Sequence, residues 1–244
     1  MSLVIAVYVP EGIVMASDSR QSIKIEGKTP EGKDFRVETV NSDTLTKTFL
    51  LKKQKTGISS FGESLLRGIP MAGHIKRFTE EILQDSDDVE STAKKIVDFM
   101  SKEFGKRDVG FHVCGYKKEN KISVPYIFYC HVGRNKISRK NIKPDGSLNY
   151  GASWSGQADI ITGLINPVVI TDQQGKQKVV KPAPPIAWAA MPLQDAIDFS
   201  IFAIRTTIDT IRFQARPKNV GGPIEALALT PDFAEWIQKK ELHA

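Results

Sequence analysis

Cysteine is nearly absent from this chain of 244 residues, and both copies, Cys114 and Cys130, lie inside apolar runs. Two isolated thiols in such surroundings fit small buried side chains in a reducing compartment better than a disulfide framework. The histidines of the same stretches, His112 and His131, have no partner at metal-ligand spacing. We therefore expect no metal site and no cofactor, and a fold held together by its apolar core.

Long hydrophobic runs are missing as well. No segment approaches the ~18 apolar residues that indicate a membrane-spanning helix. The first apolar run has no basic flank before it and is interrupted by Pro10, which is not the pattern of a signal peptide. We expect a cytoplasmic protein without a membrane partner.

Dense basic runs interleaved with aromatic residues are also lacking, although the formal net charge is +6. The basic residues are spread over residues 52–55, 117–118, 134–143 and 239–240. This distribution is typical of solvated loops and helix faces. A nucleic-acid partner is not expected, and strongly salt-dependent binding would be the sign of one.

The chain begins with a predicted β-hairpin. Two apolar runs, residues 2–9 and 13–18, flank Pro10-Glu11-Gly12, a strong turn signal. With a two-residue loop Val9 pairs with Gly12, so Leu3 faces Asp18; a three-residue loop would shift this by one. Nearly every position of both strands is apolar, which indicates that both faces are covered.

Ser2 allows a catalytic interpretation of this hairpin as well as a purely structural one. Ser is small, and an initiator Met before a small residue is normally removed in the cytosol. Ser2 would then carry a hydroxyl and a free α-amine, a nucleophile and a base on one residue. Taken alone, the stretch reads more simply as a buried hairpin that contains a serine by chance.

The next segments alternate between strands and helices. Residues 21–43 are polar and rich in turn residues, which predicts an inserted exposed hairpin, or flap. A second hairpin is expected over residues 44–51 and 57–62, with Lys47 read most simply as a solvent-facing strand residue. Helical periodicity runs from Gly62 to Leu83, with a kink or restart at Pro70, and again over residues 88–104.

The second half repeats this arrangement of blocks. Strands are expected over residues 109–116, 124–132 and 136–142, and a small-residue loop over 149–156 leads into a short helix at 158–164. A long helix (192–212), a core strand (224–229) and a short terminal helix (231–240) follow. Helices that come in blocks between antiparallel strands predict an α+β fold, a four-layer α-β-β-α sandwich of two antiparallel sheets. We expect one domain over residues 1–244.

These elements together resemble a known family. A Ser at the start of a buried strand, a hairpin ending in Ala-Ser-Asp-Ser-Arg (residues 16–20), a later strand lysine and Ser-Phe-Gly (60–62) before a helix are similar to the proteasome β-type N-terminal-nucleophile (Ntn) hydrolases. Residues 151–156 and 220–225 resemble most the bacterial branch called the ancestral β-subunit, or Anbu. The resemblance spans most of the chain and is tightest over residues 2–20 and 44–75.

The resemblance implies a set of site residues. They are the nucleophile Ser2, the aspartate Asp18, the active-site lysine Lys47, the oxyanion N–H donor Gly62 and a supporting Ser153. It also implies a supporting Arg20 and a substrate pocket bordered by Gln21, Ser60 and Ser64. Three departures stand out: Ser replaces the usual Thr, the flap lengthens the interval between Asp18 and the lysine so that Lys33 is a second candidate, and the Asp and Ser that follow the last long helix in the proteasome branch are not evident.

The function implied is a threonine/serine-type peptidase or amidohydrolase in a self-assembled homo-oligomer, a ring or a helical stack, that acts on peptides or proteins. An α-amine of pKa about 7.8 is a better resting base than a lysine of about 10.4, unless the lysine is lowered by about two to three units. The alternative is a non-catalytic assembly subunit of the same fold that retains Met1. The resemblance assigns no unfoldase or ATPase partner.

Overall fold

The computed structural model describes residues 2–172, 174–181 and 184–241 and has an α+β architecture with two five-stranded antiparallel sheets. The strands of the first sheet are, in spatial order, β12 (Gly151–Gly156), β1 (Leu3–Val9), β2 (Gly12–Ser17), β15 (Glu225–Leu229) and β16 (Ala234–Gln238). Those of the second are β11 (Lys136–Arg139), β10 (Ile122–His131), β9 (Val109–Glu119), β6 (Thr56–Gly62) and β5 (Thr48–Leu51).

The first hairpin has the predicted register. Val9 pairs with Gly12 and Val4 with Ser17, which places Leu3 level with Asp18. Both strands are buried along their whole length, because alternate residues face opposite layers. The odd-numbered side chains of β1 pack on the face of the first sheet that a long helix covers. Those of Ala6 and Tyr8 pack against the second sheet.

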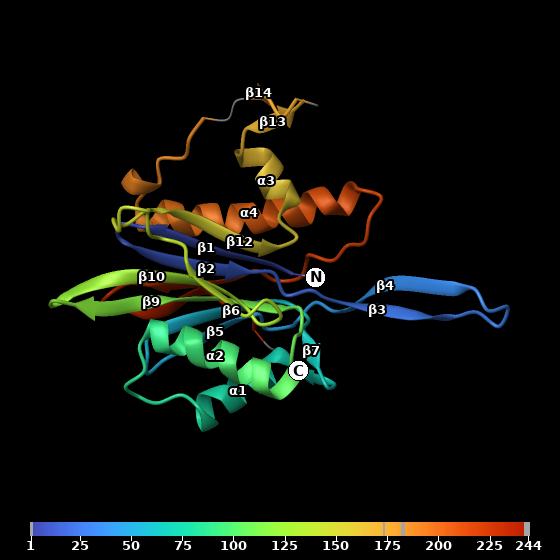
Figure 1. Cartoon of the computed structure of the whole chain (residues 1–244), viewed down its shortest axis with the longest axis horizontal. Coiled ribbons are helices and arrows are strands. Elements are labelled where there is room, and N and C mark those ends of the chain that lie inside the picture. The colour runs from blue at the N-terminus through green and yellow to red at the C-terminus, as the bar shows by residue number, and fades with distance from the viewer. Residues whose placement is uncertain (1, 173, 182–183, 242–244) are drawn as a thin grey trace.

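Helices lie on the outer faces of the two sheets, as Figure 1 shows. The helices α1 (Met71–Glu81) and α2 (Val89–Phe104) cover the second sheet through one apolar cluster. On the first sheet lie α3 (Asp159–Ile165) and α4 (Leu193–Phe213), in a second cluster with β1 and β2. A short 3₁₀ turn, η1 (Trp188–Ala190), precedes α4. The inner faces of the sheets meet in a third cluster that includes Met15, Ile127 and Leu227.

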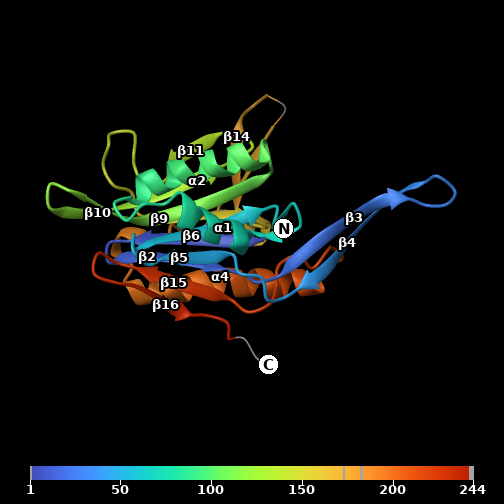
Figure 2. The ribbon, with the colours of Figure 1, turned by 90° about the horizontal axis from the view of Figure 1, so that it is seen from below.

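Three two-stranded ribbons complete the fold. They are the flap β3 (Gln21–Lys28) with β4 (Asp34–Ser42), the small pair β7 (Leu65–Leu66) with β8 (Ile69–Pro70), and β13 (Val168–Thr171) with β14 (Gln177–Lys181). The flap projects far from the sheets, as Figure 2 shows. No helix among the described residues has the length and apolarity required to cross a membrane.

The flap is amphipathic. Ile25 lies opposite Val37, and Gly27 opposite Phe35, whose ring packs over the glycine. Directly opposed residues of an antiparallel pair share a face, so Ile25, Phe35 and Val37 share one face, and they are 40–51% exposed. The other face carries charged side chains such as Glu26 and Arg36, which form an ion pair of 3.1 Å.

Three of the expected elements are wrong. The segment expected as a terminal helix is strand β16, whose residues Ala234 and Trp236 face the core while Glu235 and Ile237 are exposed, a period of two that closes the free edge of β15. Residues 151–156 form strand β12 on the other edge, beside β1, instead of a loop.

The start of the first helix is also corrected. The helix α1 begins only after Pro70, its N-cap, because β7 and β8 occupy the preceding residues. Proline has no N–H and fits a helix start, so the expected restart at Pro70 is confirmed and Gly62 does not lie at a helix start.

Candidate active site

Asp18 is a buried carboxylate that accepts four hydrogen bonds. It follows β2 directly and is fully buried. Its Oδ1 accepts hydrogen bonds from Leu3 N (2.9 Å) and Lys47 Nζ (2.7 Å). Its Oδ2 accepts from Arg20 N (3.2 Å) and Gly221 N (3.0 Å). Four donors from four segments of the chain therefore fix one carboxylate at the end of the first hairpin.

Lys47 lies just before β5 and is 1% exposed. Its ammonium group forms the 2.7 Å ion pair with Asp18, so the reading of a solvent-facing lysine is wrong. Burial lowers the pKa of Lys47, while the charge of Asp18 opposes that shift. Lys33, the second candidate, is an exposed residue of the turn at the flap tip and does not pair with Asp18.

Ser2 lies at the same end of β1. It is 3% exposed, and its carbonyl accepts a hydrogen bond from Gln157 N at 2.8 Å. The even-numbered positions of β1 face the second sheet, so alternation directs the side chain of Ser2 toward the layer that carries Lys47. A Cβ at Gly156 would collide with the Ser2 carbonyl, which explains the glycine there. Ser2 therefore directly precedes Leu3, which is hydrogen-bonded to Asp18, and its side chain is directed to the face that meets the second sheet.

Gly62 ends β6 beside this region. Its φ is +90°, and a Cβ there would meet the carbonyl of Asp108, so the position requires glycine. The N–H of Ser60 points toward the β5 side and donates to Lys47 O at 2.8 Å. Residues two apart on a strand direct their N–H groups to the same side, so the N–H of Gly62 also points toward the side of Lys47.

A cleft of about 400 Å³ opens where the flap leaves the body. Gln21, at the root of the flap, donates to Ser64 Oγ at 3.2 Å and accepts from Asn41 at 2.7 Å. Ser60, two residues before Gly62 in β6, is buried and, like Gln21, does not line the cleft. The residues that line the cleft are Ser22, Ile23, Gly62, Glu63, Ser64, Leu65 and Asp108.

Ser153 is not brought to the site. It pairs with Ala6 in β12, four positions from the level of Ser2, or roughly 13 Å along the strand. Ser155, two residues nearer, is buried and lies 3.0 Å from Nε2 of the fully buried His112. Burial is the main cause that lowers the pKa of His112, to about 3, so the ring is neutral near pH 7.

Arg20 clamps the root of the flap. Its guanidinium binds Asp43 in a bidentate pair, at 2.6 and 2.7 Å, and donates to Lys218 O at 3.0 Å. The hydrogen bond from Arg20 is the main cause that lowers the pKa of Asp43. Asp43 and Gly221 were not assigned a role from the sequence. Asp43 lies at the far end of an insertion, and Gly221, although it belongs to the family-like stretch 220–225, contributes only through its backbone.

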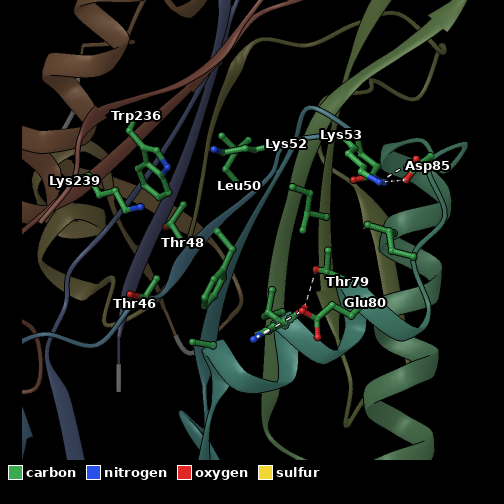
Figure 3. A pocket seen from close by; sticks show the side chains of 17 residues that line it. Thr46, Thr48, Leu50, Lys52, Lys53, Thr79, Glu80, Asp85, Trp236 and Lys239 are labelled. Atoms are coloured by element: carbon green, nitrogen blue, oxygen red, sulfur yellow. Dashed lines mark hydrogen bonds and ion pairs between the residues drawn. The ribbon is translucent and has the colours of Figure 1, made fainter. Parts of the chain in front are cut away.

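A larger hollow lies elsewhere on the surface. A groove of about 800 Å³ runs between the edge strand β5, α1 and the segment around Trp236, as Figure 3 shows. Two lysines of its rim are paired, Lys53 with Asp85 at 2.9 Å and Lys76 with Glu80 at 3.9 Å, whereas Lys52 and Lys239 form no ion pair among the described residues. Gly62 lines the smaller cleft and not this groove, while Ser2, Asp18 and Lys47 line neither, so we place the candidate site at the smaller cleft, beside Gly62. The described residues include no cluster of acidic, His or Cys side chains that could hold a metal.

Comparison with known proteins gives a fold and no sequence family. No family model matches the chain, and no curated protein sequence does. The structure is similar to Anbu from Hyphomicrobium sp. strain MC1, with a TM-score of 0.58, 14% identity and coverage of 98% of this chain and 88% of that one. It is similar also to the Gly-1 mutant of that protein, with a TM-score of 0.59, 13% identity and coverage of 98% and 86%. The chain therefore has the fold of Anbu, the ancestral proteasome β-subunit homologue.

Proposed function

We propose that this chain is a serine-type Ntn peptidase, a single domain over residues 1–244 with the four-layer α-β-β-α sandwich of that class, in which removal of Met1 frees Ser2 as the nucleophile. The observation that carries the proposal is the buried Asp18–Lys47 ion pair, which is hydrogen-bonded to Leu3, the residue next to Ser2. A buried charge pair is costly to desolvate, and a perturbed lysine next to a cleft is a functional-site signal.

The proposed reaction starts with attack by Ser2 Oγ on an amide carbonyl carbon. The hydroxyl proton passes to the α-amine of Ser2, and the N–H of Gly62 stabilises the oxyanion. Collapse breaks the C–N bond, and the leaving amine takes the proton. Water then attacks the ester carbon and gives a proton to the α-amine. Collapse breaks the C–Oγ bond, the α-ammonium returns that proton to Oγ, and the acid is released with Ser2 regenerated.

Lys47 supports this step in two ways. As a cation it lowers the pKa of the Ser2 hydroxyl, and Asp18 holds it in place. Burial lowers the pKa of Lys47, so its neutral form is more accessible than in water and it becomes a second acceptor for the hydroxyl proton. This is the direction in which the pKa of Lys47 has to shift for the lysine to compete with the α-amine as the base.

We place the substrate, an extended peptide, in the cleft at the flap root. The cleft runs between Ile23 of the flap and the segment from Gly62 to Leu65, and holds about 400 Å³. Strand ends on both sides offer backbone groups to a peptide, as in β-augmentation. Gln21 and Ser64 close one part of the cleft through their hydrogen bond.

The second part of the proposal is self-assembly, and we assign the flap to contacts with another copy of the chain. An isolated two-stranded hairpin is marginally stable in water, and this one exposes Ile25, Phe35 and Val37 on one face. The groove between β5 and α1 offers apolar side chains such as Phe49 and Leu83, and rim lysines that suit the acidic residues of the flap. The flap points away from the body, so it meets such a groove on another copy.

A non-catalytic assembly subunit is the second candidate. The segment after α4, where the proteasome branch carries an Asp and a Ser, favours this second candidate. In this chain Lys218 donates to backbone carbonyls at the end of the helix, and Gly221 contributes to Asp18 only through its backbone N–H. Such a subunit would retain Met1.

Mass spectrometry of the intact chain and labelling with an electrophilic peptide separate the two candidates. The peptidase hypothesis expects loss of Met1, a covalent adduct on Ser2, and hydrolysis of fluorogenic peptides that Ser2→Ala abolishes. Ser19→Ala is the matched control, a second buried serine near Asp18 that the mechanism does not use. A retained Met1, or equal activity in Ser2→Ala, would contradict the proposal.

A further inference from the structure

A second buried ion pair lies beside the first. Glu225, the first residue of β15, is fully buried, and Lys240 Nζ lies 3.0 Å from its Oε2. Glu225 pairs across the sheet with Ser17, the residue that precedes Asp18. The first sheet therefore places two buried carboxylates one residue apart in level, each with its own lysine.

Lys240 also holds the loop that carries Lys47. Its Nζ donates a hydrogen bond to Leu45 O at 3.2 Å. The N–H of Leu45 donates to Ser19 O at 2.9 Å, and Lys47 O accepts from Ser60 N at 2.8 Å. The loop between the flap and β5 is thus tied to the first hairpin, to β6 and to the segment after β16.

We propose that Lys240, anchored by Glu225, is a positioning residue for Lys47, which it supports by fixing this loop and by placing a second buried cation near the Lys47 ammonium group. The effect on rate rests on the proposed peptidase function, whereas the coupling between the two lysines does not depend on it. The neighbouring Lys239 has no such place: it is exposed and lies over the Trp236 ring, 5.2 Å from its centroid.

Charge gives the coupling its direction. Burial is the largest cause that lowers the pKa of Lys47, and the positive charges of Lys240 and Arg20 lower it further, against Asp18. The neutral form of Lys47, the form that accepts a proton, is therefore favoured by Lys240. The charged groups around Lys47 are those of Asp18, Arg20, Asp43, Glu225 and Lys240.

The test compares Lys240→Met with the double variant Lys240→Met/Glu225→Gln, which leaves no unpaired buried charge if the single variant does not fold. Lys239→Met is the matched control. The pKa of Lys47 is measured by NMR titration of ¹³C-lysine-labelled protein, with Lys47→Met to assign the signal, and the acid limb of kcat/KM is measured on a fluorogenic peptide.

We expect Lys240→Met to raise the pKa of Lys47, and with it the acid limb, by about half a pH unit or more, and Lys239→Met to leave both unchanged. In the double variant the loss of the Glu225 charge opposes the loss of the Lys240 charge, so we expect a smaller rise there. An unchanged pKa of Lys47 in the folded Lys240→Met protein, or in the double variant where that alone folds, overturns the inference. The NMR measurement tests the coupling independently of activity. A pKa shift in a protein that hydrolyses no peptide supports the coupling, while the peptidase proposal fails. An active peptidase without a pKa shift supports the peptidase proposal, while the coupling fails.

Discussion

Asp18 and Leu3 bind each other in both directions, since the N–H of Leu3 donates to Asp18 Oδ1 at 2.9 Å and the N–H of Asp18 donates to the Leu3 carbonyl at 3.3 Å. The same Oδ1 accepts from Lys47 Nζ. A single oxygen therefore fixes both the strand that begins at Leu3 and the lysine. This connects the fold of the first hairpin to the geometry of the proposed nucleophile.

Asp18→Asn is expected to reduce kcat/KM by 100-fold or more with the fold retained. The amide cannot balance the charge of Lys47 and offers one acceptor oxygen where the carboxylate uses two. We expect a loss of roughly 2–4 kcal/mol in the free energy of unfolding, since the variant leaves the Lys47 ammonium buried without its counter-charge. Urea denaturation and peptide hydrolysis measure the two effects.

Asp43→Asn is the comparison for Asp18→Asn. Asp43 is also paired with a cation, Arg20, but it is partly exposed and lies at the flap root. We expect a much smaller loss of stability, because exposed pairs contribute little. Equal activity losses in the two variants would argue against a special role for Asp18.

Gly62→Ala is expected to impair both folding and activity. At φ +90° an alanine is strained, and its Cβ would meet the Asp108 carbonyl, so the end of β6 must shift and move the proposed oxyanion donor. Gly68→Ala is the matched control: its φ is +76°, but no atom lies within 4 Å of its Cβ, so it costs only the backbone strain of about 1–2 kcal/mol.

The measurements for Gly62→Ala are kcat/KM and the thermal midpoint. We expect a drop in kcat/KM of at least tenfold beyond that of Gly68→Ala. A Gly62→Ala protein with the activity of the control would remove Gly62 from the mechanism.

The sequence predicted the first hairpin and two possible registers, because Pro10 and Gly12 mark the turn without deciding the loop length. The structure has the two-residue loop, in which Val9 pairs with Gly12 and Leu3 is level with Asp18. The long helix α4 and the helix α2 were likewise predicted, because their apolar periodicity is long enough to be unambiguous. Residues 234–238 were not, since five residues do not separate a period of 2 from one of 3.6, and only the free edge of β15 decides between them.

The site was predicted less completely than the fold. The role expected for Lys47 came from family resemblance, while its pattern alone indicated an exposed side chain. Glu225, Lys240 and Gly221 contribute through contacts that join segments about 200 residues apart, and no local pattern reports such contacts. Ser153 and Ser155 lie two residues apart in β12. Only the pairing of that strand with β1 shows that Ser155 lies nearer to Ser2.

Acid is expected to destabilise the protein through His112. Its pKa is lowered from 6.5 to about 3 by burial and by the charge of Lys140, so between these values the unfolded chain binds a proton that the folded chain does not. Stability therefore falls as the pH drops below about 6.5 and continues to fall to about 3, by about 1.4 kcal/mol per pH unit.

The variant His112→Gln tests this prediction, because it keeps a polar group near Ser155 and removes the titration. We expect chemical denaturation at pH 4 and pH 7 to show a smaller difference for the variant than for the parent, by roughly 3 kcal/mol. The same difference in both proteins would assign the acid sensitivity to the paired carboxylates, such as Glu90, whose pKa is lowered to about 2 mainly by its hydrogen bond from Lys117.

The apolar face of the flap is expected to hold copies of the chain together. Ile25→Glu with Val37→Lys places opposite charges on directly opposed residues, which preserves the hairpin and replaces two of the three exposed apolar residues of that face, leaving Phe35. The control, Glu26→Arg with Arg36→Glu, exchanges an ion pair on the other face of the same ribbon. Native mass spectrometry and sedimentation should show an oligomer for the parent and the control and a monomer for the first variant. An oligomer that survives in the first variant would place the interface elsewhere, and a monomeric parent would contradict self-assembly.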